Sequence, residues 1–144
     1  MERKHPKDIG DRSTLAIALA LQDRGWATFI PFGENTRSDL LVDNGTRLLR
    51  VQCKTGRLRN GSVMFKTCSS YAHHRNPKVP IRTYAGEIDA FAVYCPELGS
   101  VYLVPIEDVP VSSAAALRVT PARNCQVRRV RQAASYEIAR VNVY

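Results

Sequence analysis

The sequence predicts a single α/β domain. Three observations lead to this class: a long run of apolar helix formers near the N-terminus, an Asn-Gly dipeptide between two apolar segments, and a second pair of apolar segments farther along. At 144 residues the chain is long enough to bury a core and too short for two ordinary domains. No repeat or linker divides it, so residues 1–144 are expected to form one domain.

The first expected element is a helix over residues 8–25. Residues 15–21 are strong helix formers and apolar nearly all round, so we expect this helix to be largely buried. Asp8 or Asp11 is placed to cap its start, and Gly25 is placed to end it.

The next elements are strands. A short strand is expected over residues 26–30, followed by two strands over 39–43 and 47–54. Asn44-Gly45 joins the last two, and this dipeptide favours a two-residue type I′ hairpin turn because both central residues need positive φ. These two strands are the clearest structural signal in the chain.

The rest of the chain gives shorter patterns. Residues 68–86 are polar, basic and irregular, which indicates a surface loop. The other expected elements are a strand over 63–67, a strand pair over 88–95 and 100–104, a short helix within 105–116 and a strand over 117–120.

Charge is the most unusual bulk property. A formal net charge of +8 and a pI near 9.7 favour a polyanionic partner, because each cation placed on a phosphate releases a condensed counterion. No basic amphipathic helix of the kind that lies on a membrane is evident, and no apolar run reaches the roughly 18 residues of a spanning helix. With no signal-peptide pattern at the N-terminus, a cytoplasmic protein is expected.

The four cysteines are widely spaced and form no C-x-x-C pair. Buried free thiols are therefore expected in preference to zinc ligands or disulfides. The cysteines are Cys53, Cys68, Cys95 and Cys125.

The hairpin divides into two chemically different faces. With a two-residue loop, Asp39 lies opposite Arg50, and Gln52 and Lys54 share its face. The other face is wholly apolar and must pack into a core. A loop one residue longer would move Gln52 to the apolar face, so this arrangement depends on the register.

The polar face carries a carboxylate, an amide oxygen and an ammonium group. Mg²⁺ prefers oxygen ligands, which Asp39 and Gln52 can supply alongside a phosphate and water. Lys54 can lower the pKa of an attacking water or neutralise charge on a pentacovalent phosphorane. The alternative is a half-exposed strand with a surface Asp-Arg pair across it.

The order of these residues resembles that of the PD-(D/E)XK nucleases, in which an Asp is followed by a hairpin and then by Glu or Gln-x-Lys. Here the matching residues are Ser38-Asp39 and Gln52-Cys53-Lys54. The resemblance is to the group I intron homing endonuclease branch, which is itself similar to Holliday-junction resolvases. It rests on residues 32–40, 50–58 and 86–94.

The resemblance implies a restriction-endonuclease-like core, with a mixed central β-sheet flanked by helices, and a Mg²⁺-dependent DNA endonuclease activity in which Mn²⁺ can substitute for Mg²⁺. It implies a further acid from the first helix, which falls on Asp11 or on Asp8; Asp11 lies on the same stripe as Leu15, and a helix cap is its alternative role. Because Gln52 replaces an acid, we expect weaker metal affinity and dependence on millimolar Mg²⁺ or on Mn²⁺.

DNA contacts are expected beside and beyond the hairpin. The side chains are cations or histidines in polar segments, and their alternative is a solvated loop. They are Arg57, Arg59, Lys66, His73, His74, Arg75, Lys78 and Arg82. Asp89 lies in an apolar strand, where an acid is costly unless paired, so it either supports the site or forms a structural ion pair.

Four functions remain open from the sequence. The first is a metal-dependent DNA endonuclease acting as a homodimer or larger assembly, because cutting both strands needs two sites. The second is a Holliday-junction resolvase, which differs in its substrate. The third is a DNA-binding module whose nuclease site is inactive, a reading that Gln52 supports. The last is an interaction protein unrelated to nucleic acid.

Overall fold

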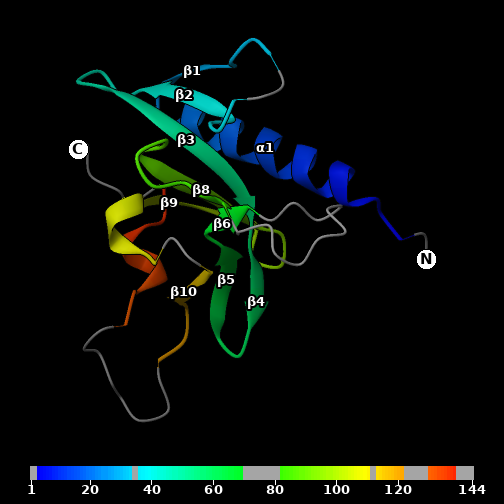
Figure 1. The fold of residues 1–144 in the computed structure, drawn as a ribbon. Coiled ribbons are helices and arrows are strands. Elements are labelled where there is room, and N and C mark those ends of the chain that lie inside the picture. The colour runs from blue at the N-terminus through cyan, green and yellow to red at the C-terminus, as the bar shows by residue number, and fades with distance from the viewer. Residues whose placement is uncertain (1–2, 34–35, 70–81, 111–112, 122–129, 139–144) are drawn as a thin grey trace.

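A mixed five-stranded sheet forms the centre of the fold, with its strands in the order β1-β2-β3-β8-β9 (Figure 1). The β3–β8 pair is parallel and the other neighbours are antiparallel, which confirms the expected α/β class and mixed sheet. The computed structural model describes residues 3–33, 36–69, 82–110, 113–121 and 130–138. The strands of this sheet are β1 (Ala27–Phe29), β2 (Leu40–Asp43), β3 (Leu48–Thr55), β8 (Ala90–Cys95) and β9 (Ser100–Pro105).

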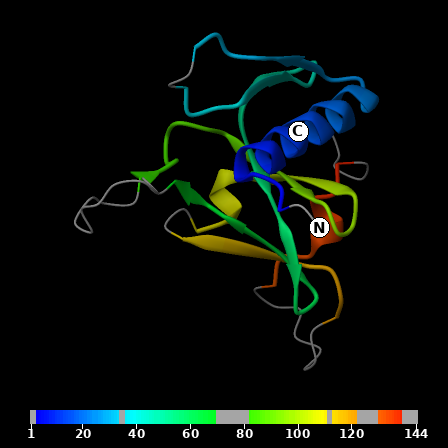
Figure 2. The same cartoon turned by 90° about the vertical axis from the view of Figure 1, so that its right-hand side faces the viewer.

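Helix α1 (Pro6–Asp23) covers one face of this sheet (Figures 1 and 2). Its buried stripe is Ser13, Ile17 and Leu21, spaced four residues apart so that they share one side of the helix. Leu15 and Leu19 are 71% and 63% exposed on another side. The expectation of a largely buried helix is therefore wrong, because α1 is an outer layer that contacts the sheet along one stripe only.

The ends of α1 are set by two different residues. His5 is the N-cap, with its Nδ1 accepting a hydrogen bond from the Lys7 N–H at 3.2 Å, so neither Asp8 nor Asp11 has the capping role expected for it. Gly25 ends the helix as predicted, with φ of +86°. The N–H groups of Gly25 and Trp26 then bond back to carbonyls of the last turn, as in a Schellman motif.

The opposite face of β8 and β9 packs against a second, three-stranded sheet in the order β10-β5-β4 (Figures 1 and 2). Its strands are β4 (Arg57–Arg59), β5 (Ser62–Lys66) and β10 (Ala114–Arg118). Helices were expected to flank the central sheet. In the described part of the chain, α1 is the one α-helix and a β layer takes the second side.

The β2–β3 hairpin has a longer loop than predicted, yet its faces are as predicted. Asp43 pairs with Leu48, so the loop is four residues long rather than two, and each opposed pair shifts by two positions. Asn44 Oδ1 organises the loop by accepting hydrogen bonds from the N–H groups of Thr46 and Arg47, both at 3.0 Å. A shift of two residues preserves the inward and outward alternation, so the apolar side still packs against α1.

The two-residue turn with positive φ lies elsewhere. Asn60 and Gly61, between β4 and β5, have φ of 52° and 75°, the left-handed geometry of a type I′ turn. The two-residue type I′ turn expected at Asn44-Gly45 is therefore wrong, and Asn60-Gly61 is the Asn-Gly dipeptide that adopts this geometry.

The remaining elements are short. The expected helix within 105–116 is wrong except for one 3-10 turn, and Ala114–Ala116 instead join β10, because pairing with β5 outweighs the helix propensity of alanine. The ends of segment 68–86 pair with each other as a small sheet, and residues 70–81 lie outside the described residues. These elements are β6 (Cys68–Ser69), β7 (Arg82–Thr83), η1 (Ile106–Asp108) and η2 (Ala133–Ser135).

The described cysteines are free buried thiols, as expected. They are Cys53, Cys68 and Cys95; Cys125 lies outside the described residues. Within the described ranges, none of the helical segments has the length and apolar character needed to cross a membrane.

Candidate active site

Asp39 lies immediately before β2 and is held against β3 at two points. Its N–H donates to the Val51 carbonyl at 2.8 Å, and its carboxylate Oδ2 accepts from the Cys53 N–H at 3.0 Å. The carboxylate thus takes the place of a backbone partner at the end of the hairpin ladder. Among the described residues its other oxygen, Oδ1, has no hydrogen-bond partner.

Gln52 lies opposite Asp39. The register pairs Leu40 with Val51, and one step further sets Asp39 against Gln52, directly rather than diagonally as predicted. Side chains at opposed positions have Cβ atoms about 4.5–5.5 Å apart. Gln52 makes one long contact, from Nε2 to the Cys53 carbonyl at 3.5 Å, and this leaves the amide oxygen available.

Lys54 shares this face two residues further along β3 and is held by an aromatic ring. Its Nζ donates to the Tyr84 hydroxyl at 3.2 Å and lies 4.8 Å from the centroid of that ring. The Arg37 guanidinium lies 3.9 Å from the same centroid and pairs with Glu87. Tyr84 is 4% exposed, so this buried ring contacts two cations, and one of them, Lys54, is close enough to Asp39 to lower its pKa.

Burial raises the pKa of the Asp39 carboxyl, against the opposing effects of the Cys53 N–H and of the Lys54 charge. Burial also raises the pKa of the Cys53 thiol to about 12, with the Asp39 charge as the next cause. Cys53 is therefore a protonated thiol at neutral pH and does not act as a nucleophile, since that chemistry needs the thiolate. The ionisable chemistry of this face rests on Asp39 and Lys54.

The raised pKa of Asp39 predicts a stability change in Asp39→Asn. A carboxyl whose folded pKa exceeds its unfolded value of 3.8 favours folding while protonated, and that contribution is lost as pH rises through the folded pKa. Asparagine keeps an acceptor for the Cys53 N–H and carries no charge. We expect its melting temperature at pH 7, in chelator, to exceed wild type by about 2–4 °C. The gap should close near pH 3; an equal or lower melting temperature at pH 7 would contradict this account.

No acid of α1 faces the site. Ser13 faces the sheet and its Oγ bonds to Thr55 Oγ1 at 2.6 Å. Asp11 lies two residues earlier, about 200° around the helix, on the exposed side with Leu15. The expectation that Asp11 points at the hairpin is therefore wrong, and Asp8 is likewise exposed in the first turn.

Three of the expected DNA-contacting cations gather beside Lys54. Lys54, Arg57, Arg59 and Lys66 line one cavity of about 380 Å³, between the end of β3 and the exposed side of β4 and β5. The other expected contacts cannot be placed in this way. His73, His74, Arg75, Lys78 and the side chain of Arg82 lie outside the described residues.

Asp89 has the contacts of a structural ion pair. Its Oδ2 accepts from the Arg50 N–H at 2.7 Å and from Arg50 Nε at 3.3 Å, and its own N–H donates to the Arg50 carbonyl at 2.8 Å. These contacts lower the pKa of Asp89, although its partial burial acts the other way. The pairing fixes the register of β8 against β3, on which the site depends.

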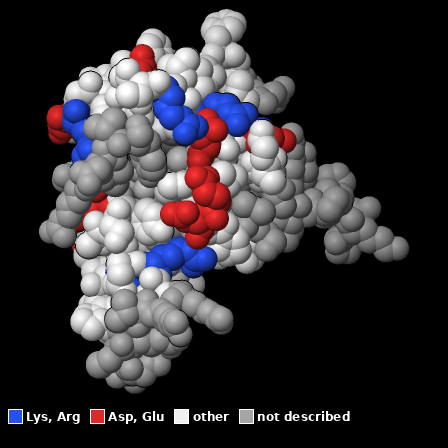
Figure 3. All heavy atoms as spheres, turned by 90° about the vertical axis from the view of Figure 1, so that its left-hand side faces the viewer, with Lys and Arg blue, Asp and Glu red and all other residues white. Residues whose placement is uncertain are grey.

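Carboxylates gather on the surface near the start of β8 and the end of β9 (Figure 3). Asp89 and Glu107 line a hollow there together with Arg47. A surface rich in carboxylates repels phosphate. A polyanion is therefore better accommodated by the cations around Lys54 than by this face.

Asp39 and Gln52 form a small ligand set. Among the described residues, no three His, Cys, Asp or Glu side chains gather as a metal cluster. Asp39 and Gln52 nevertheless occupy opposed positions when the β2–β3 register is extended by one residue, and burial of the carboxylate disfavours its charge. A hard divalent cation fits this arrangement, since it would offset that charge and accept water or phosphate as its remaining ligands.

Two residues of the cluster around Lys54, Tyr84 and Arg37, were not assigned to the site from the sequence. Tyr84 lies within residues 68–86, which were expected to form a surface loop, and Arg37 carried no expected role. Tyr84 is 30 residues from Lys54 in the chain, and no periodic pattern connects them. The signal in the sequence that could have drawn attention to Tyr84 was an aromatic residue directly after a basic segment.

Comparisons with known proteins agree with this geometry. A sequence profile described as PD-(D/E)XK endonuclease matches residues 4–139. Among solved structures, the chain is similar to a bacterial homing endonuclease, I-Ssp6803I, with 25% sequence identity and a TM-score of 0.72. The similarity covers 94% of this chain and 90% of that one. No curated protein sequence matches the chain.

Proposed function

The chain belongs to the PD-(D/E)XK endonuclease family, and we propose that Asp39, Gln52 and Lys54 form its metal-dependent site for hydrolysing DNA phosphodiester bonds. As a DNA endonuclease it resembles homing endonucleases, the class of its structural neighbour. The observation that carries the proposal is the juxtaposition of a partly buried carboxylate, an amide and a fixed ammonium on one face of the β2–β3 hairpin.

Asp39 and Gln52 would hold the metal through Asp39 Oδ1 and the Gln52 amide oxygen. Nucleases of this family generally use divalent metal ions, and Mg²⁺ is the ion that we propose here, with Mn²⁺ able to replace it. Such an ion, when bound, polarises the phosphate and lowers the pKa of bound water. Because Gln52 is neutral, the site carries one negative charge fewer than a pair of acids, and millimolar metal is expected to be required.

Lys54 acts on the charge that develops during cleavage. Tyr84 holds its ammonium in place before substrate binds, so little reorganisation is needed when negative charge grows on the phosphate oxygens. The neighbouring cations Arg57, Arg59 and Lys66 bind the DNA backbone next to the scissile phosphate.

A homo-oligomer, dimer or larger, is part of the proposal because cutting both strands at once needs two sites. Large exposed apolar residues near the start of the chain offer surface for such an association. They include Leu15, Leu19, Phe29 and Ile30. Direct appearance of linear plasmid, without accumulation of nicked circles, is the expected sign of paired sites.

Supercoiled plasmid tests the proposal. Wild type is expected to cut it with Mg²⁺ or Mn²⁺ and to stop in chelator, and Asp39→Asn is expected to leave it intact under all conditions. Branched and linear duplexes should be assayed alongside, since the preferred DNA structure is a separate question. Equal cutting by wild type and Asp39→Asn, or no cutting of any substrate with either metal, would overturn the proposal.

The second candidate is a DNA-binding module whose nuclease site is inactive, and Gln52 is the residue that favours it. Gln52→Glu separates the two readings in the same assay. Salt-sensitive DNA binding by an inert wild type, together with cutting by Gln52→Glu, would identify a binding module. Cutting by both, with the variant saturating at lower Mg²⁺, is expected if the wild-type site is active.

A further inference from the structure

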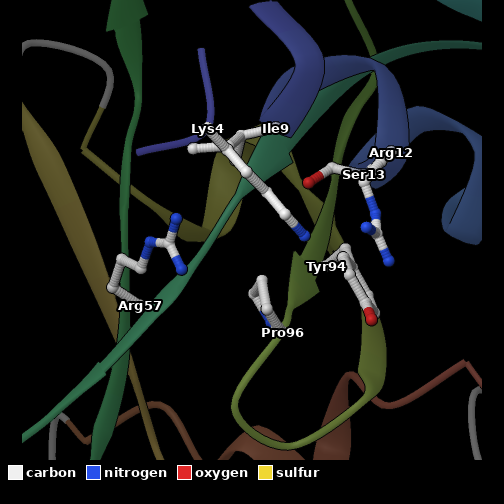
Figure 4. A pocket seen from close by; sticks show the side chains of 7 residues that line it. All are labelled: Lys4, Ile9, Arg12, Ser13, Arg57, Tyr94 and Pro96. Carbon is white, nitrogen blue, oxygen red and sulfur yellow. The ribbon is translucent and has the colours of Figure 1, made fainter. Parts of the chain in front are cut away.

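A second cationic hollow lies beyond Arg57, next to the first two turns of α1. It has a volume of about 190 Å³ and is lined by Lys4, Ile9, Arg12, Ser13, Arg57, Tyr94 and Pro96. Figure 4 shows Lys4 reaching between Arg12 and Arg57, with the charged groups of all three directed toward one space. We call this hollow the Lys4 pocket.

Three cations line the Lys4 pocket and no carboxylate does. Arg57 has an ion pair with Glu97 at 3.6 Å, and both side chains are partly exposed. Among the described residues, Lys4 and Arg12 form no ion pair. Bringing three like charges together is unfavourable unless an anion shares the space, so the pocket has the composition of an anion site.

The side chains, rather than the helix end, supply this attraction. The first N–H groups of α1 are already used: the Lys7 N–H donates to His5 Nδ1, and those of Asp8 and Ile9 donate to the His5 carbonyl. Tyr94 contributes its ring to the lining, with its hydroxyl at the end of the ring farther from the Lys4 ammonium (Figure 4).

Arg57 connects this pocket to the candidate active site. It lines both the Lys4 pocket and the cavity that contains Lys54, Arg59 and Lys66. Ser13 of the pocket also bonds to Thr55, which lies between Lys54 and Arg57 in the chain. A line of cations therefore runs from Lys66 past Lys54 and Arg57 to Arg12 and Lys4.

We propose that the Lys4 pocket binds a backbone phosphate of the DNA whose scissile phosphate lies at Lys54, as a subsite beyond the cleavage position. The inference rests on the proposed endonuclease function and extends it by naming where the flanking strand is held. Free inorganic phosphate carries the same chemistry and is the other source of ligand that the experiment must separate.

The experiment measures DNA affinity without cleavage. A fluorescently labelled duplex of about 25 base pairs is titrated with protein in chelator over a series of salt concentrations. The Lys4→Ala/Arg12→Ala double variant is compared with wild type and with Arg3→Ala/Lys7→Ala. This control removes two positive charges from the same segment at exposed positions that do not line the pocket.

The pocket variant is expected to bind DNA about ten-fold more weakly at moderate salt, with the slope of log affinity against log salt reduced by about two. The control variant should lose much less affinity. Equal losses in the two variants, or no loss in the pocket variant, overturn the inference even if wild type binds and cuts DNA. Failure of wild type to bind DNA at low salt removes the endonuclease proposal and this inference together.

A calorimetric titration with inorganic phosphate separates the two ligand sources. Under the proposal, the Lys4→Ala/Arg12→Ala variant loses much more affinity for DNA than for inorganic phosphate. Phosphate binding that is lost in the pocket variant, with DNA affinity unchanged, would assign the pocket to free phosphate and overturn the DNA subsite.

Discussion

Replacing Lys54 with alanine is expected to slow DNA cleavage by about 10²–10³-fold under single-turnover conditions at saturating DNA. Lys54 lies on the hairpin face beside Asp39, and its ammonium donates a hydrogen bond to the Tyr84 hydroxyl at 3.2 Å. Its charge therefore acts at a fixed position on the developing phosphorane. Metal affinity should change little, because Lys54 donates no ligand atom.

Lys66→Ala is the matched control for this prediction. Lys66 lines the same cavity as Lys54 and is exposed on β5, without the contact to Tyr84. Its loss should weaken DNA binding and leave the saturated rate within a few-fold of wild type. A wild-type saturated rate in Lys54→Ala would mean that Lys54 only binds the DNA backbone. Equal slowing of the two variants would mean that Lys54 has no role in the chemical step that distinguishes it from Lys66.

The shared face of Asp39, Gln52 and Lys54 was predictable from the sequence, because it depends on whether the register shifts by an odd or an even number of residues and not on the length of the loop itself. The loop at Asn44 has four residues instead of two, yet Asp39, Gln52 and Lys54 still share a face. An error of one residue would have moved Gln52 and Lys54 to the side packed against α1. The alternation of polar residues with Val51 and Cys53 excluded that error, since both must be buried.

Sequence reasoning failed where tertiary contacts decide the outcome. Leu15 and Leu19 were expected to be buried in the core, but the helix contacts the sheet along a single stripe of residues and both leucines lie outside that stripe. Ala114–Ala116 were expected to be helical, but they pair with β5 and therefore form part of strand β10. The link between Tyr84 and Lys54 was out of reach for the same reason, since a contact spanning 30 residues leaves no local pattern.

Phe91 carries the second large prediction, because it supports both the core and the site. It is fully buried in β8, in register with Gln52 of β3. Its ring lies 5.6 Å from that of Tyr84, edge to face, and 5.8 Å from that of Phe65. Removing it takes away the surface on which Tyr84 rests, and hence part of what positions Lys54.

Phe91→Ala is expected to lower the free energy of unfolding by about 3–5 kcal/mol, the cost of a large buried ring and its cavity. Urea denaturation should show a lower midpoint with an unchanged slope. Phe32→Ala is the matched control, since Phe32 is fully exposed, and a surface change of this kind is worth at most about 0.5 kcal/mol. Equal midpoints for the two variants would contradict the packing described for β8. If Phe91→Ala stays folded, slower cutting at saturating metal would follow from the loss of support for Tyr84, because the ligand atoms of Asp39 and Gln52 are unchanged.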